Sequence, residues 1–181
     1  MKPKKVFVTV GTTKFPKLID KIVTEDVLRL FQSLGYNFIQ IQTGKDFYPE
    51  AILPKLSSYN VKSESPLVIE YNDLVIRFEE YFEDFDGEIT SSDIVISHAG
   101  AGSCLDVLRK KKPLLVVINE DLMDNHQIEL AEELQKHGYL YYSTCDTLGE
   151  ALQRDFTILK PYPEPDKSLF PNYLDKCVGF V

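Results

Sequence analysis

The sequence predicts an α/β domain in which a mainly parallel sheet is flanked by helices. Short runs rich in β-branched residues alternate along the chain with stretches whose apolar residues recur at helical intervals. Residues 93–118 read as strand, glycine-rich turn, helix and strand, and such a run within about 30 residues is a βαβ unit. Repeated alternation of this kind favours a parallel sheet. The length of 181 residues suits one such domain, or one domain with an extension.

The first third of the chain predicts a strand, a helical stretch and a second strand. Residues 6–10 are a buried apolar strand that ends at Gly11. Residues 15–34 carry apolar side chains at helical intervals, and Gly35 stands where a helix stop belongs. Residues 36–42 form the next strand, whose alternation does not reveal which face is buried.

The middle of the chain predicts a hairpin and an acidic helix. Residues 46–59 contain two prolines, which argue against a long helix. Residues 67–69 and 74–78 are short strands on either side of an Asn-Asp turn. Residues 81–91 are a short acidic helix with three apolar side chains facing inward, namely Phe82, Phe85 and Ile89.

The βαβ unit and the elements after it complete the predicted sheet. Its helix spans residues 104–111 and stops at Pro113, between strands at 93–96 and 114–118. Beyond it we expect a helix, a strand and a further helix, at residues 125–137, 139–142 and 147–159. We therefore divide the chain into a domain over residues 1–160 and a proline-rich tail with a short helix over residues 161–181, a candidate for partner contact.

Composition and charge narrow the class of protein. The net charge is −8, which argues against nucleic acid as a partner because phosphate binding needs a basic surface. No apolar run is long enough to span a membrane or to serve as a secretory signal. Residues 70–93 hold nine carboxylates and one basic residue; this is either a solvated face or a docking face for a basic partner.

The cysteines give no metal signature. Cys104, Cys145 and Cys177 lack metal-ligand spacing, and their odd number suits free thiols in a reducing compartment. Cys104 follows a glycine-rich turn, where a helix N-terminus could lower the thiol pKa. A catalytic thiol there would need His98 or His126 as its base, and a buried structural cysteine is the commoner case.

Three segments that follow predicted strands are candidates for a ligand site, because ligands of open α/β sheets bind at the carboxyl ends of the strands. The first is Gly11-Thr12-Thr13. The second runs from His98 to Ser103, where Gly100 and Gly102 let backbone approach a ligand. The helix expected near Ser103 offers free N–H groups to a diphosphate.

Side chains of the second segment leave alternatives open. His98 adds a donor that could be cationic near a phosphate. Ser103 is either a phosphate donor or the helix N-cap, and the plain alternative is a tight turn with nothing bound. Asp106 lies three residues after Ser103, as in a capping box; it could instead reach a ribose hydroxyl.

The third segment, residues 119–127, is richer in polar groups than a connecting loop needs. Either Asn125 or Asp124 is a candidate N-cap of the helix that follows. Asn125, His126 and Gln127 are also suited to recognising sugar hydroxyls through paired hydrogen bonds.

One interpretation is an NAD(P)-binding oxidoreductase domain. Gly100-Ala101-Gly102 supplies two of the three glycines of the dinucleotide-binding motif, and Leu105 replaces the third. Glu120 stands about where an acid that binds ribose belongs. The motif lies in mid-chain, however, and the remaining residues supply no evident catalytic domain.

The second interpretation is a glycosyltransferase, and it rests on a family resemblance carried by three motifs. They are Val8-Thr-Val-Gly-Thr-Thr-Lys-Phe-Pro-Lys-Leu18, then Asp93-Ile-Val-Ile-Ser-His-Ala-Gly-Ala-Gly-Ser103 with Leu105-Asp106, and Asn119-Glu-Asp-Leu-Met-Asp-Asn-His-Gln127. In this order they resemble the cytosolic catalytic subunit of the two-subunit UDP-N-acetylglucosamine transferase of dolichol-linked N-glycan assembly. Ala101 departs from that pattern, where threonine is more familiar, and residues 70–93 and the tail look divergent.

The resemblance implies a Rossmann-like fold similar to the C-terminal, donor-binding half of a GT-B glycosyltransferase. It implies transfer of N-acetylglucosamine from UDP-N-acetylglucosamine to dolichyl-diphosphate-N-acetylglucosamine on the cytosolic face of the endoplasmic reticulum. The acceptor half is expected on a membrane-anchored partner subunit, through which alone this chain reaches the membrane. We expect no metal or other cofactor to be required.

The resemblance also distributes roles among the candidate residues. Asp106 would hold the ribose, and Asn125, His126 and Gln127 would bind the sugar. The diphosphate would be bound by Gly11, Thr12, Gly100, Gly102 and Ser103, helped by the helix N-terminus and His98. Ala101 is a further candidate for binding the donor. The general base is expected on the partner. A non-catalytic binding module remains a third interpretation, against which the intact donor motifs argue.

Overall fold

A computed structural model of the chain describes residues 3–45, 60–64, 66–121 and 125–164. Its centre is an eight-stranded sheet in the order β3-β4-β5-β2-β1-β6-β7-β8. The six strands from β5 to β8 in this order run parallel, and β3 and β4 extend the sheet antiparallel beyond β5. The strands are β1 (Lys5–Thr9), β2 (Phe38–Gln42), β3 (Asn60–Glu64), β4 (Leu67–Tyr71), β5 (Leu74–Glu79), β6 (Ile94–His98), β7 (Leu114–Ile118) and β8 (Tyr141–Thr144).

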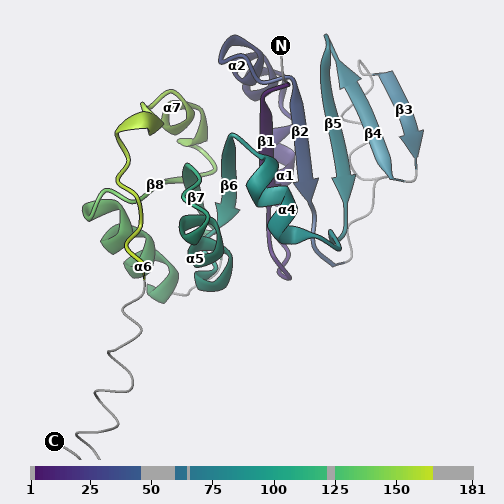
Figure 1. Cartoon of the computed structure of the whole chain (residues 1–181). Helices are drawn as coiled ribbons and strands as arrows, with labels where there is room; N and C mark the ends of the chain where they lie inside the picture. Colours follow the sequence, from purple (N-terminus) through teal and green to yellow (C-terminus); the bar gives the residue numbers. More distant parts are fainter. Residues whose placement is uncertain (1–2, 46–59, 65, 122–124, 165–181) are drawn as a thin grey trace, which may run out of the picture.

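Helices cover both faces of the sheet (Figure 1). One face packs against α1 (Pro16–Ile22), α2 (Glu25–Ser33) and α7 (Leu148–Leu152). The other packs against α4 (Phe85–Ser91), α5 (Ala101–Arg109) and α6 (Asn125–Lys136). Consecutive strand residues point to opposite faces, so the central strands β6 and β7 are buried along their whole length. This confirms the predicted α/β class and explains why β7 is apolar throughout and why β6 is apolar over its first three residues.

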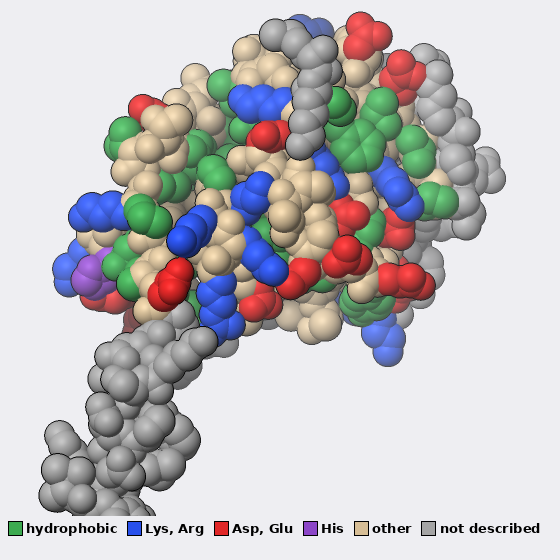
Figure 2. All heavy atoms as spheres, viewed as in Figure 1, with side chains coloured by type: hydrophobic (Ala, Val, Ile, Leu, Met, Phe, Trp, Pro, Cys, Tyr) green, Lys and Arg blue, Asp and Glu red, His purple; other side chains and the backbone are tan. Residues whose placement is uncertain are grey.

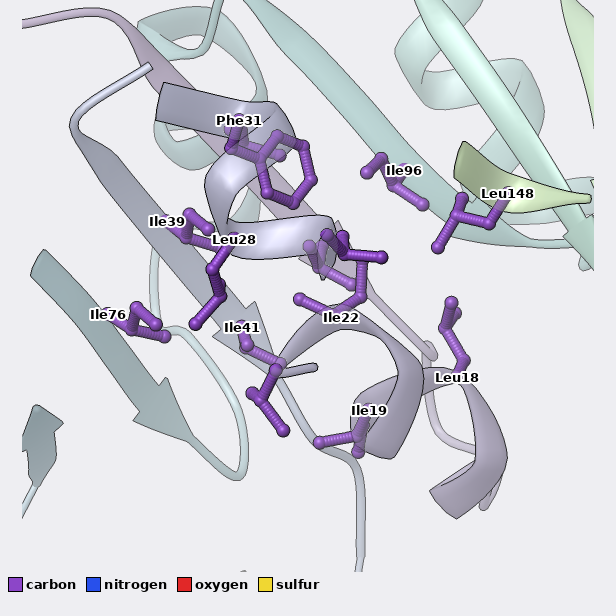
Figure 3. Close-up of a cluster of buried hydrophobic side chains, with 14 of the residues drawn as sticks. Leu18, Ile19, Ile22, Leu28, Phe31, Ile39, Ile41, Ile76, Ile96 and Leu148 are labelled. Atoms are coloured by element: carbon purple, nitrogen blue, oxygen red, sulfur yellow. The ribbon is translucent and has the colours of Figure 1, made fainter. Parts of the chain in front are cut away.

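The larger core lies between the sheet and the pair α1 and α2. Figure 3 shows Leu28 of α2 over the strands that carry Ile39, Ile41 and Ile76, and all four side chains are fully buried. Leu148 brings α7 into the same core. The hydrophobic contact of these helices therefore fixes the position of the segment that joins β1 to β2.

The structure corrects the helical stretch expected over residues 15–34. It is two helices, because Thr24 has extended backbone angles and separates α1 from α2. Threonine is favoured at the position before a helix, and the acidic pair Glu25 and Asp26 in the first turn of α2 suits the helix dipole. The apolar pattern continues across the break because both helices face one core.

Other boundaries differ less. The helix expected over residues 147–159 ends at Leu152, and after an extended stretch a short 3₁₀ helix spans Phe156–Ile158. The hairpin is confirmed: Asn72 and Asp73 both have positive φ between antiparallel β4 and β5, as a type I′ turn requires. β3 was not predicted. Residues 46–59 and the tail from residue 165 lie outside the described residues. The expected division into a domain and a tail therefore stays a prediction.

Many carboxylates of residues 70–93 have contacts within the chain. Asp84 accepts the Gly87 N–H at 2.8 Å and caps α4, and Asp86 forms an ion pair with Lys110 at 2.7 Å. Asp93 accepts the backbone N–H of Lys5 at 2.7 Å. Acidic and basic side chains are interspersed on the face that α4 and α5 cover (Figure 2). These contacts favour the solvated-face interpretation of this acidic stretch.

Truncating the core should test this packing. We expect Leu28→Ala to lower the free energy of unfolding by about 2–5 kcal/mol, because it removes buried methyl groups and leaves a cavity. The control is Ile158→Ala, whose wild-type side chain is 69% exposed and which should change stability by less than about 0.5 kcal/mol. Denaturant unfolding followed by circular dichroism measures both. Equal effects of the two substitutions would contradict the packing described.

Candidate functional site

The strand order places a candidate site at the carboxyl ends of β1 and β6. The chain leaves β1 through α1 and α2 toward β2 on one side, and leaves β6 through α5 toward β7 on the other. Ligands of open α/β sheets bind at such a reversal of strand order. Two of the segments singled out in the sequence, the turn at Gly11 and the segment from His98 to Ser103, meet here as predicted.

The imidazole of His98 fills the space between these two turns. A Cβ added at Gly11 would lie 2.6 Å from its Cε1 atom, and one added at Gly100 would lie 2.2 Å from its Nε2 atom. Gly11 also has a positive φ of 61°, which other residues adopt only at a cost. The two glycines are therefore needed to accommodate the ring, in addition to any ligand.

Burial makes His98 neutral at physiological pH. The residue is only 8% exposed, and among the described residues its Nδ1 atom has no hydrogen-bond partner. Burial lowers the pKa of His98, and the nearby backbone of Thr9 opposes that change only in part. Burial therefore favours the neutral imidazole in the protein without a ligand, and the expected cationic donor beside a bound phosphate stays a prediction.

The start of α5 is also corrected. The helix begins at Ala101 with Gly100 as its N-cap, so Gly102 and Ser103 lie in the first turn. Ser103 is not the cap, and the capping box with Asp106 does not form. Within the described part of the chain no side chain caps this end. The backbone N–H groups of Ala101, Gly102 and Ser103 precede the first internal bond, Cys104 N–H to Gly100 O at 3.0 Å, and so stay available for an anion.

Asp106 lies one turn further along α5. Its carboxylate is 3.6 Å from the Arg109 guanidinium, and its side chain is 45% exposed. A carboxylate that is exposed and near the open helix end remains suited to hydrogen-bonding a hydroxyl. Its expected contact with ribose stays a prediction.

The segment after β7 lies beside the second segment. Gln127, in the first turn of α6, lines a small apolar gap together with Ala99 and Cys104. Asn119 accepts the Asp121 N–H at 3.2 Å and so forms a local turn. The backbone of Asn125 and His126 begins α6, whereas the side chains of both and residues 122–124 lie outside the described residues.

The cysteines of the described residues are structural. Burial raises the pKa of the Cys104 thiol to about 12, and its Sγ atom lies 3.7 Å from the His98 carbonyl oxygen. Burial likewise raises the pKa of Cys145 to about 11. Neither thiol is ionised near neutral pH, so neither is a nucleophile.

A fourth segment at this edge was missed. Gln42, at the end of β2, donates from Nε2 to the Gly11 carbonyl at 3.0 Å. A Cβ added at Gly44 would lie 2.4 Å from the Thr13 carbonyl oxygen. The sequence did hold a signal for this segment, because a polar side chain and a glycine stand at the end of a strand here as at the other segments.

The state of His98 can be tested by pH. Because its folded pKa lies below the ordinary value of 6.5, the unfolded chain binds the proton more readily. The stability due to neutral His98 is therefore present above about pH 6.5 and is lost as the pH falls through the folded pKa. We expect the melting temperature of the wild type to fall between about pH 7 and pH 5, and His98→Gln to lack this component. His137→Gln, at a side chain 57% exposed, should retain it; if all three proteins show one slope, His98 is not the cause.

Comparison with known proteins agrees with this geometry. Residues 5–170 match the family described as glycosyltransferase family 28 C-terminal domain. The chain is 34% identical to the "UDP-N-acetylglucosamine transferase subunit ALG13" of Cryptococcus neoformans, over 98% of each chain. It is 43% identical over 81% of its length to the mouse protein of that name, of which it spans only 11%.

Solved structures show the same fold. An NMR solution structure of ALG13 superposes with a TM-score of 0.71 at 27% identity, covering 96% of this chain and 94% of that one. MurG of Acinetobacter baumannii superposes with a TM-score of 0.66 at 18% identity, covering 98% of this chain and 50% of MurG. The fold thus recurs as one half of a larger GT-B glycosyltransferase. The chain belongs to the glycosyltransferase family 28 C-terminal domain family, in which it groups with the ALG13 subunits.

Proposed function

We propose that this chain is the donor-binding, catalytic subunit of an N-acetylglucosaminyltransferase. It transfers N-acetylglucosamine from UDP-N-acetylglucosamine to dolichyl-diphosphate-N-acetylglucosamine. The observation that carries the proposal is the 34% identity, over 98% of both chains, to a protein named as a UDP-N-acetylglucosamine transferase subunit. The open N-terminus of α5 beside the Gly11 turn supports it, because a UDP-sugar needs a site for its diphosphate.

The chemistry is a displacement at the anomeric carbon. The acceptor hydroxyl attacks that carbon, the bond from the carbon to the diphosphate oxygen breaks, and UDP leaves with the electron pair. The hydroxyl proton passes to a general base, which we place on the partner subunit. The leaving diphosphate gains negative charge, so N–H groups fixed in advance at its position lower the barrier.

Different residues of this chain bind the diphosphate, the ribose and the sugar of the donor. Gly11 and Thr12 on one turn, and Gly100, Ala101, Gly102 and Ser103 at the start of α5, receive the diphosphate. Neutral His98 keeps the two turns apart at a fixed distance. Asp106 binds the ribose, and Asn125, His126 and Gln127 bind the sugar. No metal or other cofactor is assigned a role.

A partner subunit is part of the proposal. The similar proteins are named as subunits, and the described residues include no helix apolar and long enough to cross a membrane. We infer that the partner is anchored in the endoplasmic reticulum membrane, binds the lipid-linked acceptor and holds this chain at the cytosolic face.

Reconstitution tests the proposal directly. The assay is transfer of labelled N-acetylglucosamine to dolichyl-diphosphate-N-acetylglucosamine by three samples. The first is the chain alone, the second is membranes that carry the partner but lack their own catalytic subunit, and the third is both together. We expect product only from the combination. If the folded chain binds those membranes and no product forms, the transferase proposal fails, and titration with nicotinamide cofactors becomes the next measurement.

A pair of glycine substitutions tests the diphosphate position. A Cβ added at Gly102 in α5, or at Gly149 in α7, meets no atom within 4 Å. Both Gly→Ala variants should therefore keep the fold and gain up to about 1 kcal/mol of helix stability. We expect only Gly102→Ala to raise the KM for donor in the reconstituted assay, because its methyl group lies where the diphosphate approaches. An unchanged KM in Gly102→Ala would remove this glycine from the site.

A further inference from the structure

Both polar backbone groups of Gly11 are held by side chains. The Thr9 hydroxyl oxygen accepts the Gly11 N–H at 3.0 Å, and the Gln42 amide donates to the Gly11 carbonyl at 3.0 Å. Since a carbonyl can only accept, the NH₂ end of the amide must face it. Gln42 is 5% exposed, so the Gly11 carbonyl is held from the protein interior.

The Gly11 carbonyl and the Thr12 N–H belong to one peptide unit. That unit is planar, and in its usual trans form the two groups point in opposite directions. A carbonyl directed inward to Gln42 therefore directs the Thr12 N–H outward, at the carboxyl edge of the sheet. Among the described residues no acceptor is found for this N–H group, whereas the next one, that of Thr13, bonds the Val10 carbonyl at 3.2 Å.

We propose that Gln42 is a positioning residue, which orients the Gly11–Thr12 peptide so that the Thr12 N–H binds the donor diphosphate. This inference rests on the proposed function, since it specifies how the same site receives its donor. Gln42 itself touches no reacting atom. Its effect passes through one hydrogen bond and one rigid peptide plane, because Gly11, with its wide range of backbone angles, would otherwise let that plane rotate.

The chain offers a matched control. Gln40 lies two residues earlier on β2 and on the same face of the sheet, and it is 3% exposed. Its register partner on β1 is Phe7, whereas that of Gln42 is Thr9, beside the turn. Gln40→Met and Gln42→Met remove the same amide from the same strand, and only the second removes the hydrogen bond to Gly11.

The experiment is a titration of the ¹⁵N-labelled chain with UDP, followed by two-dimensional amide spectra. In the wild type and in Gln40→Met we expect the Thr12 amide resonance to move downfield as UDP binds. In Gln42→Met we expect that movement to disappear and the Kd for UDP to rise about tenfold or more, the usual effect of losing a hydrogen bond to a charged group. An immobile Thr12 resonance at saturation, an unchanged Kd in Gln42→Met or no binding of UDP to the wild type in the millimolar range would overturn the inference.

Gln42→Glu keeps the inference testable if the methionine variant does not fold. At neutral pH its carboxylate faces the Gly11 carbonyl with no proton to donate, whereas in acid the protonated group donates again. UDP affinity relative to wild type at the same pH should therefore rise as the pH falls, and a ratio independent of pH would contradict the inference. The comparison with wild type at the same pH cancels the titratable and charged groups that both proteins share near this turn, among them His98, and Glu79 with its partner Arg77.

The transfer assay separates this inference from the proposed function. Transfer by the wild type with an unchanged donor KM in Gln42→Met overturns the role of Gln42 and leaves the transferase intact. If UDP binding moves the Thr12 resonance but the reconstituted system transfers no sugar, the inferred role of Gln42 stands and the proposed transferase activity is overturned.

Discussion

The imidazole of His98 stands between Gly11 and Gly100, and the geometry of the whole carboxyl edge depends on this contact. The ring is too large to share the space with even a methyl group on either turn. It therefore sets the distance between the end of β1 and the start of α5. A charged ring would be expensive in so dry a position, so the same packing that fixes the distance also keeps the ring neutral. The geometry of this edge and the protonation state of His98 therefore both follow from burial of the ring between the two turns.

Sequence patterns predicted much of the fold because the strongest signals are local. The run from Asp93 to Ile118 contains its own strand, turn, helix and stop, and the structure has each of them. The hairpin at Asn72 and Asp73 was equally plain, since few residues accept positive φ. The break at Thr24 was hidden because α1 and α2 share one core, so the apolar interval runs on across it.

The start of α5 was misplaced for a different reason. Serine is a better N-cap than glycine by local preference, and that preference pointed to Ser103. In the structure the helix begins three residues earlier, with Gly100 as its N-cap in an extended conformation and close to the ring of His98. The contact of Gln42 with Gly11 could not be seen in the sequence for another reason, because it joins residues 31 apart in the sequence. What sequence patterns could not supply was contact between segments.

The pairing of β1 with β6 has a consequence for how the chain is made. Lys5 and Asp93, which meet at the start of these strands, are 88 residues apart, and closing so long a loop costs entropy before any contact compensates it. During synthesis β1 can pair with β2 early, but its other side waits for β6 to leave the ribosome. Until then the nascent chain carries an unpaired central strand, which invites association with other chains. The residues around His98 therefore cannot come together until β6 has been made.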